Sequence, residues 1–293
     1  MAYKNLGIDI GDYPNAYAQY ANEITLPLHT LLSDADVEYV CRSLKKAMDE
    51  VLQKGRLLWR SRSEFMKKIA ILGSANALKP KIIIETLYEM NLLLDIELFL
   101  FTENDTGVCA DYCKEKGIKT VVFLSTKLDE TNTFELAKRQ EIDLLVSAGW
   151  PYKIPSLFLQ LFKFNPINCH GSVLPDYRGN RAYMHYWANC EEYYGATIHY
   201  MNERFDDGNI LIQGRLKMYL EETPSILHRR SAELCAFLLP SAIALVEAGY
   251  EGRQVDGLKR YFKKLTPEEF DQYREYNEQK SKLERKLTPH KIV

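Results

Sequence analysis

Apolar runs and amphipathic stretches alternate along the chain from residue 66 onward. Short apolar runs at 67–72, 95–101, 120–124 and 143–147 predict buried strands, and Gly73 follows the first of them. Between these runs, helical periodicity predicts helices over 81–94, 108–116 and 133–141, and a longer helix over 223–248 with Pro224 near its start, where proline is tolerated. Alternating strands and helices predict an α/β fold with a doubly wound, mostly parallel sheet.

The two ends of the chain do not share this alternation. Leu32 opens an amphipathic stretch that predicts a helix toward Leu52, with Ser33 as its N-cap, and a basic, polar linker follows at 53–65. After Gly249 the composition becomes charged and aromatic, which predicts a strand or loop, a short helix and a frayed end. We therefore expect an N-terminal helical extension with its linker (1–65), a main domain (66–249) and a short C-terminal tail (250–293).

Composition excludes several classes of function. The chain has 293 residues, 46% apolar, and its net charge of −2 gives no electrostatic footprint for nucleic acid. It shows neither a signal peptide nor an apolar run long enough to span a bilayer. Its six cysteines are scattered, which favours free thiols and a reduced, cytoplasmic setting. Cys109 and Cys113 lie four apart on an expected helix, and without a second pair they favour buried thiols over a metal site. A homodimer is compatible with this composition.

The residues with the clearest chemistry lie at 167–179, where an apolar run leads into a loop broken by glycine and proline. On a strand, Asn168 and His170 point the same way, with Cα atoms roughly 6.5 Å apart at about 3.3 Å per residue. Cys169 between them faces away and is expected in the core. Downstream, Asp206 and Asp207 lie on a turn before an apolar strand. An amide donor, an imidazole and a carboxylate suit acyl transfer, in which an oxyanion is stabilised and a proton moves.

The spacing of these residues resembles that of the formyltransferase family that uses 10-formyltetrahydrofolate. The matching motifs are Asn168-x-His170, then Ser172-x-Leu174-Pro175-x-Tyr177-Arg178-Gly179, then Asp206-x-Gly208. Flanking stretches at 195–199 and 210–213 match as well, so the resemblance covers about 66–249. It implies a Rossmann-like formyltransferase fold. It also implies that Asn168, His170 and Asp206 are catalytic, because Asp-x-Gly favours Asp206 over Asp207. His185 and His199 are expected to be core or surface residues.

The resemblance further implies two binding regions. The loop at 148–155 and the stretch leading to the aspartate would line the folate pocket, at positions Tyr152, Lys153, Ile154, Asn202, Glu203, Arg204, Phe205 and Asp206. Residues after the main motif would bind the acceptor, namely Tyr177, Arg178, Asn180 and Arg181, since arginine suits phosphate or carboxylate. An alternative is that Arg178 only braces its own loop. Trp150 is expected to pack rather than bind. The loop at 73–77 lacks a G-x-G-x-x-G pattern, so a nicotinamide site is not expected. A metal site is not expected either, because Cys109 and Cys113 have no second pair of ligands.

Residues 1–52 resemble the C-terminal tail of the sugar aminotransferases that depend on pyridoxal phosphate. The Schiff-base lysine of that family has no counterpart in this sequence, so the segment is expected to carry no transamination. It is interpreted as the remnant of a gene fusion or as an upstream reading frame. An unrelated helical extension is the alternative.

The expected reaction is transfer of a formyl group from 10-formyltetrahydrofolate to an amine, and three branches of the family compete. Methionyl-tRNA formyltransferases add an RNA-binding domain, whereas only about 44 residues follow Gly249 here. The glycinamide ribonucleotide branch remains open. The aminotransferase-like tail favours the third branch, which formylates nucleotide-linked amino sugars, and a 4-amino-4,6-dideoxyhexose for surface polysaccharide (lipopolysaccharide O-antigen) synthesis is the specific expectation. A catalytically inactive binding protein is the reading from another class, and the intact Asn168, His170 and Asp206 set favours an enzyme.

Overall fold

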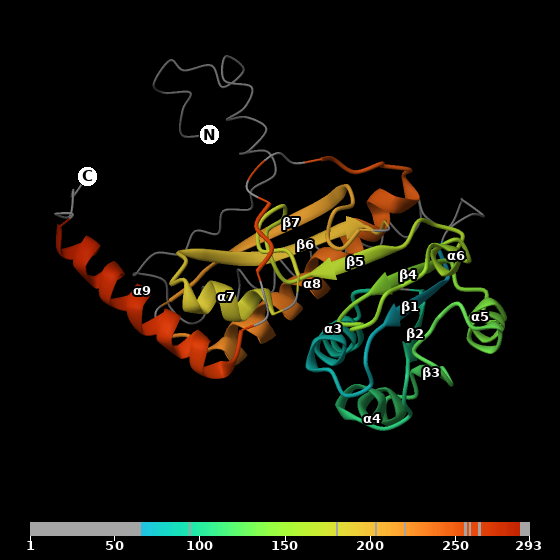
Figure 1. Cartoon of the computed structure of the whole chain (residues 1–293). Coiled ribbons are helices and arrows are strands. Elements are labelled where there is room, and N and C mark those ends of the chain that lie inside the picture. The colour runs from blue at the N-terminus through green and yellow to red at the C-terminus, as the bar shows by residue number, and fades with distance from the viewer. Residues whose placement is uncertain are drawn as a thin grey trace, which may run out of the picture. The chain divides into compact units, whose positions relative to one another are not determined.

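The computed structural model describes residues 66–287 except 94, 180, 203, 220, 255, 256, 258, 263 and 264, with side chains up to residue 279. The expected extension and linker (1–65) lie outside the described residues. The elements in chain order are β1 (Lys68–Leu72), α3 (Leu78–Glu89), β2 (Glu97–Thr102), α4 (Val108–Glu115), β3 (Lys119–Val122), α5 (Thr131–Lys138), β4 (Leu144–Ser147), α6 (Ser156–Leu159), β5 (Ile167–His170), α7 (Ala182–Ala188), β6 (Tyr193–Tyr200), β7 (Ile210–Lys217), α8 (Pro224–Glu247) and α9 (Pro267–Leu287) (Figure 1).

The strands form one sheet in the order β3-β2-β1-β4-β5-β6-β7. The pairs from β3 to β5 are parallel, while β6 pairs antiparallel with both β5 and β7. The prediction of a mostly parallel, doubly wound α/β sheet is therefore confirmed. The strand order reverses at β1, with β2 on one side and β4 on the other, and in such sheets ligands bind at the carboxyl ends of the strands beside this point.

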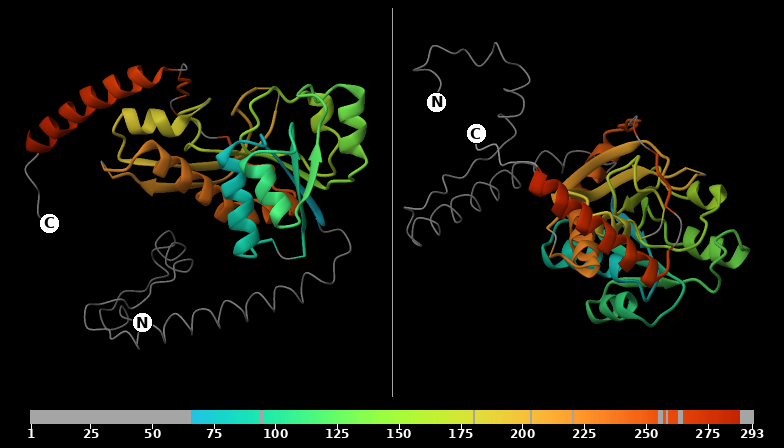
Figure 2. Two further views of the ribbon diagram at one scale, coloured as in Figure 1. Left: turned by 90° about the horizontal axis from the view of Figure 1, so that it is seen from below. Right: turned by 60° about the vertical axis from the view of Figure 1, so that its left-hand side comes forward.

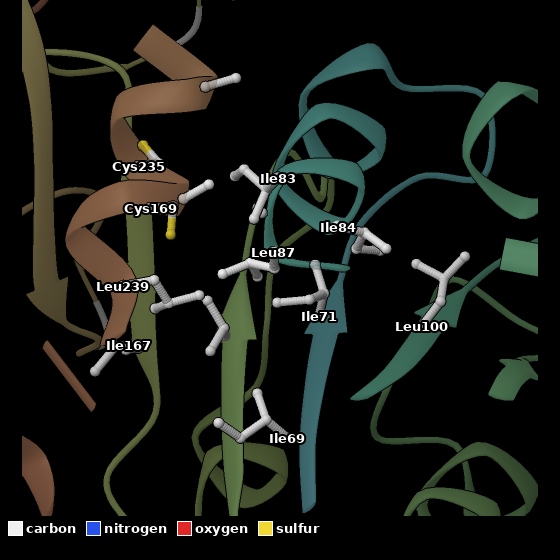
Figure 3. Packing of buried hydrophobic residues seen from close by; sticks show 14 of the residues in the cluster. Ile69, Ile71, Ile83, Ile84, Leu87, Leu100, Ile167, Cys169, Cys235 and Leu239 are labelled. Carbon is white, nitrogen blue, oxygen red and sulfur yellow. The ribbon is translucent and has the colours of Figure 1, made fainter. Parts of the chain in front are cut away.

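Both faces of the sheet are covered, because alternate side chains of each strand enter different clusters. Ile69 and Ile71 of β1 pack with residues of α3, α4 and α8, whereas Ala70 and Leu72 pack with residues of α5 and α6. Figure 3 shows the first cluster, in which Leu239 approaches the sheet from α8. Burial on both faces explains why the strand sequences read as continuous apolar runs.

The helix α8 agrees with the predicted bounds of 223–248. Thr223 caps its start by accepting a hydrogen bond from the backbone N–H of Ile226 at 3.4 Å, and Pro224 occupies its first turn. Its face toward the sheet places Cys235 beside Cys169 of β5 (Figure 3). Cys169 is buried in the core as expected, and its hydrogen bond with the Cys235 thiol, followed by burial, raises the pKa of its own thiol.

The C-terminal segment holds a longer helix than the short one predicted. α9 has 21 residues and packs across α7 (Figure 2). Phe270 is buried at this contact, Arg274 donates to the carbonyl oxygen of Trp187 at 2.7 Å, and Asn277 donates to that of Ala188 at 2.9 Å. These partners lie about 90 residues away, so local periodicity could not reveal them. Among the described helices, none combines the length and apolar character needed to cross a membrane.

Candidate active site

The candidate catalytic residues line a pocket of about 510 Å³ at the carboxyl ends of β4 and β5. In Figure 1 this is where the chain leaves β5 for the loop that leads to α7. Asn168 and His170 belong to β5, and strand alternation turns both toward the pocket. Asp206 comes from the turn between β6 and β7, where its backbone is left-handed with φ +50. Two segments distant in sequence, β5 and the β6–β7 turn, thus converge on one small volume.

Asp206 is the centre of this arrangement. Its Oδ1 lies 3.3 Å from Nδ1 of His170 and accepts a hydrogen bond from Nδ2 of Asn168 at 3.3 Å. Its Oδ2 accepts from the backbone N–H of Gly179 at 2.9 Å. Burial would raise the pKa of Asp206, but His170, His199 and this N–H outweigh it and hold the pKa well below its usual range. The carboxyl group is therefore ionised at any pH near neutrality.

His170 is held between two oxygen acceptors. Its Nε2 lies 3.0 Å from the carbonyl oxygen of Tyr177, which can only accept, so Nε2 carries the hydrogen and donates it. The neutral imidazole then has its lone pair on Nδ1, the nitrogen beside Asp206. Burial lowers the pKa of His170, and the carboxylate of Asp206 opposes this effect. A proton that arrives on Nδ1 is stabilised directly by Asp206.

His199 belongs to the site, although the sequence led us to expect a core or surface residue. It stands opposite Asn168 in the antiparallel pairing of β6 with β5 and is 2% exposed. Its Nδ1 lies 2.7 Å from the carbonyl oxygen of Tyr200 and its Nε2 lies 3.1 Å from Nδ2 of Asn168. The first contact assigns the hydrogen to Nδ1, so Nε2 accepts from the Asn168 amide. Only the match of 195–199 to the family motif pointed toward this residue.

The predicted folate side of the pocket is brought together from two segments. The positions that line it are Tyr152, Lys153, Ile154, Asn202, Arg204, Phe205 and Asp206. Glu203 lies outside the described residues. Tyr152 and Phe205 expose 43% and 67% of their surface, so this side of the pocket carries open aromatic surface. Trp150 is buried and packs edge-on against Tyr152 at 5.3 Å, in agreement with its expected packing role.

The predicted acceptor side is only partly brought to the pocket. Arg181 lines it, whereas Asn180 lies outside the described residues. Tyr177 is 2% exposed, stacks on Tyr186 at 3.9 Å and donates its hydroxyl hydrogen to Glu191. Its side chain therefore does not face a substrate, contrary to the prediction, and only its carbonyl oxygen serves the site. A left-handed backbone at Tyr177, with φ +54, directs the side chain into the core.

Arg178 is also absent from the pocket wall. Its guanidinium pairs with Asp207 at 2.5 Å, and this hydrogen bond lowers the pKa of Asp207. The structure thus matches the alternative in which Arg178 braces its own loop. It also separates the two acidic residues, since Asp206 faces His170 and Asp207 faces Arg178.

The pocket is also lined by side chains that sequence reasoning did not select, among them Lys79, Tyr183, His228 and Tyr261. Lys79, in the first turn of α3, donates to the carbonyl oxygen of Cys169 and brings a positive charge close to His170. Tyr183 stacks on His228 at 4.5 Å. Burial, and secondarily Lys79, lowers the pKa of His228 to about 4. Among the residues with described placement, no group of three His, Cys, Asp or Glu side chains is arranged to hold a metal ion.

Comparison with known proteins agrees with this geometry. Residues 67–243 match a family model described as formyl transferase. The chain is 27% identical over 175 residues to the chloroplastic phosphoribosylglycinamide formyltransferase of Arabidopsis thaliana, covering 56% of this chain and 60% of that one. It is 29% identical over 150 residues to the methionyl-tRNA formyltransferase of Methylacidiphilum infernorum, covering 50% and 47%. It is 25% identical over 197 residues to the GDP-perosamine N-formyltransferase of Brucella melitensis, covering 67% and 76%.

The fold is also that of a solved sugar N-formyltransferase from Shewanella. The two structures superpose with a TM-score of 0.52 at 20% identity, over 67% of this chain and 76% of the other. The chain spans about half to three-fifths of the length of the first two relatives named above.

Proposed function

Because the chain belongs to the formyl transferase family, we propose that it transfers a formyl group from 10-formyltetrahydrofolate to the amino group of a nucleotide-linked amino sugar. The observation that carries the proposal is the convergence of Asn168, His170 and Asp206 on one pocket at the end of β5. We assign this catalysis to residues 66–249. A 4-amino-4,6-dideoxyhexose is the specific acceptor proposed, and its formylated product would serve surface polysaccharide synthesis.

Asn168 supplies the donor for the oxyanion that develops when the amine attacks the formyl carbon. Its two amide hydrogens point to Asp206 at 3.3 Å and to His199 at 3.1 Å. The contact to Asp206 is long for a hydrogen bond, so this hydrogen can be redirected to the formyl oxygen at small cost. His199 keeps the second hydrogen and with it the orientation of the amide. One such donor is typically worth about 2.7–4 kcal/mol in the transition state.

His170 and Asp206 take up the proton that the amine loses. In the tautomer described above, Nδ1 of His170 is the free base and faces the carboxylate of Asp206 at 3.3 Å. When the proton reaches Nδ1, an imidazolium and a carboxylate form a hydrogen-bonded ion pair shielded from water. The carbonyl oxygen of Tyr177 holds the other ring nitrogen and keeps the imidazole in this orientation. General acid–base catalysis of this kind contributes about 100- to 10,000-fold.

The residues of the pocket fit the proposed formyl donor. Tyr152 and Phe205 offer exposed aromatic surface, and Lys153 and Asn202 line the same pocket with polar side chains. The aromatic side chains suit the flat face of a pterin, and the polar groups suit its hydrogen-bonding edge. The donor's role is to supply the electrophilic formyl carbon.

Charges around the pocket support an acceptor with phosphate groups held by side chains. A loop between a strand and a helix N-terminus commonly binds phosphate, but here the β1–α3 loop already binds a carboxylate. Glu103 accepts hydrogen bonds from the hydroxyl of Ser74 at 2.5 Å and from the backbone N–H of Ala75 at 3.2 Å. Its negative charge repels a phosphate from that loop. Four cationic side chains of the described residues line the pocket, and of these Lys79 and Arg181 lie outside the proposed folate positions and are therefore assigned to the diphosphate of a nucleotide sugar.

Two of the relatives bear on the choice of acceptor. The match to the GDP-perosamine N-formyltransferase spans 76% of that protein, and this supports the amino-sugar acceptor. Glycinamide ribonucleotide is the second candidate, favoured by 27% identity to the Arabidopsis protein over 60% of its length.

The test is a formyl-transfer assay on a panel of acceptors. The full chain is incubated with 10-formyltetrahydrofolate carrying a ¹³C-labelled formyl group and with 4-amino-4,6-dideoxyhexoses linked to different nucleoside diphosphates, with glycinamide ribonucleotide, or with methionyl-tRNA. Mass spectrometry detects one labelled formyl group on the acceptor, and the Asn168→Ala, His170→Ala double variant is the matched control. Label on an amino sugar supports the proposal. Label only on the ribonucleotide or tRNA overturns the acceptor, and no label anywhere overturns the activity.

A further inference from the structure

The segment between α8 and α9 contributes one described residue, Tyr261, to the wall of the catalytic pocket. It is drawn orange to red in Figure 1 and lies beyond residue 243, where the match to the family model ends. Arg253 exchanges two backbone hydrogen bonds with Ile210, at 2.8 and 2.9 Å, which ties the segment to the start of β7. Further along, the backbone N–H of Arg178 donates to the carbonyl oxygen of Arg260 at 3.1 Å. The predicted tail is therefore bound to the loop that follows β5.

Side chains on both sides of Tyr261 anchor this part of the segment to the protein. The guanidinium of Arg260 donates to both carboxylate oxygens of Asp176, with Nε–Oδ1 2.9 Å and Nη2–Oδ2 2.5 Å, and lies over the ring of Tyr177 at 4.9 Å. Phe262 stacks on the same ring at 4.5 Å. Because alternate side chains of an extended chain point in opposite directions, these two contacts turn Tyr261 to the other side.

Tyr261 lies over Gly179 and lines the pocket. A Cβ atom added to Gly179 would meet Cε2 and Cζ of the tyrosine ring at 2.9 Å, so the ring covers this glycine directly. The backbone N–H of Gly179 donates to Asp206, which in turn faces His170. One edge of the ring is thus fixed beside the catalytic carboxylate, while 66% of the residue remains exposed.

We propose that Tyr261 is a specificity-determining residue whose ring packs against the sugar that carries the reacting amine. Its contact with Gly179 places it next to a residue that donates to the catalytic carboxylate, within reach of the part of the acceptor nearest the amine. The glycine that it covers is followed directly in the chain by the acceptor positions 180 and 181, of which Arg181 lines the same pocket. The C–H face and methyl group of a dideoxyhexose offer the apolar surface that an aromatic ring covers well. The chemistry of the acceptor, though not the position of Tyr261, rests on the proposed function.

The place of Tyr261 in the sequence suits a role in specificity. Relatives named for a ribonucleotide, a tRNA and a nucleotide sugar all resemble this chain, while the family model covers only 67–243. The shared part contains the formyl-transfer residues. A pocket residue beyond it distinguishes acceptors without altering the common chemistry.

The test compares three variants of the full chain: Tyr261→Ala, Tyr261→Phe and, as a matched control, Tyr276→Ala. Tyr276 lies on α9, is 68% exposed and does not line the pocket. The kcat, the acceptor KM and the donor KM are measured with whichever acceptor the wild type formylates fastest. About 55 Å² of apolar sugar surface uncovered, at about 25 cal/mol per Å², corresponds to about a tenfold rise in acceptor KM for Tyr261→Ala. The donor KM, and all constants of the other two variants, should stay within about twofold.

Several outcomes overturn the inference. They are an unchanged acceptor KM in Tyr261→Ala, a rise in the donor KM instead, or a loss of kcat alone, which would mean that the ring only positions Gly179. Thermal unfolding checks that each variant is folded. If the alanine variant is not, Tyr261→Leu keeps bulk over Gly179 and is expected to raise the acceptor KM by about threefold. If the fastest acceptor is not an amino sugar, the proposed function fails, yet the same constants still decide the role of Tyr261.

Discussion

Replacement of Asp206 by asparagine should slow formyl transfer by about three orders of magnitude while leaving the protein folded. In the wild type, the backbone N–H of Gly179 donates to Oδ2 of Asp206 at 2.9 Å. Asparagine has nearly the same size and keeps an oxygen that can accept this hydrogen bond. It removes the negative charge that faces Nδ1 of His170. The variant therefore separates the electrostatic role of the carboxylate from its place in the packing.

The size of the effect follows from the distance between the two groups. At 3.3 Å, a carboxylate and an imidazolium attract by about 5 kcal/mol at an effective dielectric constant of about 20. Most of this attraction is realised only when the amine proton has reached His170, so its loss raises the barrier of the proton transfer. A thousandfold fall in kcat corresponds to about 4 kcal/mol, within that limit.

The direction in which the pH profile of kcat shifts distinguishes the loss of the charge from a change in packing. Burial lowers the pKa of His170 and Asp206 raises it, so removal of the carboxylate should lower this pKa further. Transfer needs neutral Nδ1, and activity is lost as the pH falls through the pKa of His170. The acid limb of the kcat profile should therefore move to lower pH in Asp206→Asn, while the plateau falls. NMR titration of the His170 ring protons reports the same shift directly.

The thermal stability of the wild type should also depend on the ionised form of Asp206. The pKa of Asp206 in the folded protein lies below its unfolded value of about 3.9, so its contribution is present above about pH 4–5 and is lost as the pH falls toward the folded value. The wild-type Tm should fall more steeply than the variant's between about pH 5 and pH 3. An acid limb that moves to higher pH in Asp206→Asn, or a kcat above a tenth of wild type, would refute the reasoning.

Three further predictions follow from the site and the chain ends. Asn168→Ala should lower kcat by about two to three orders of magnitude, with calorimetric Kd values for both substrates within about threefold, because the amide acts on the oxyanion; weakened binding at unchanged kcat would contradict this. Arg178→Ala should lower the Tm through loss of its pair with Asp207 and keep the acceptor KM within about twofold; the reverse pattern would return Arg178 to substrate binding. A chain that starts at Met66 should keep kcat/KM within about threefold, and a loss beyond about tenfold in a folded truncated protein would place residues 1–65 in the catalytic unit.

Much of the fold was readable from local patterns. Parallel strands buried on both faces are short apolar runs, and helices between them show their own period, so the order of elements up to β4 and the strand β5 were predicted. The short helix α6 between β4 and β5 was not predicted. The bounds differ by a few residues where the end turns of a helix depend on tertiary contacts, as at α3, which spans Leu78–Glu89 rather than 81–94. The length of α9 was missed because its buried residues face α7, whose position the sequence does not state.

Part of the candidate site could likewise be predicted from local patterns, and part could not. Strand alternation alone directed Asn168 and His170 to one side, and the spacing Asp-x-Gly selected the acidic residue that does face them. His199 reaches the site through an antiparallel pairing that no local pattern encodes. Tyr177 was assigned to the substrate because its motif adjoins the site, but a positive φ turns its ring into the core.

The sequence by itself determined the class of fold, the strand that carries the amide and imidazole, and the kind of chemistry they suit. These follow from interactions between near neighbours, namely side-chain alternation, helical period and the spacing of motif residues. Only the tertiary structure decided which residues complete the pocket. Lys79 and Tyr261 stand far from the motif in sequence and reach the pocket because the sheet order and the hydrogen bonds of the segment between α8 and α9 bring them there. Such contacts depend on the packing of the whole domain, which no short stretch of the chain specifies.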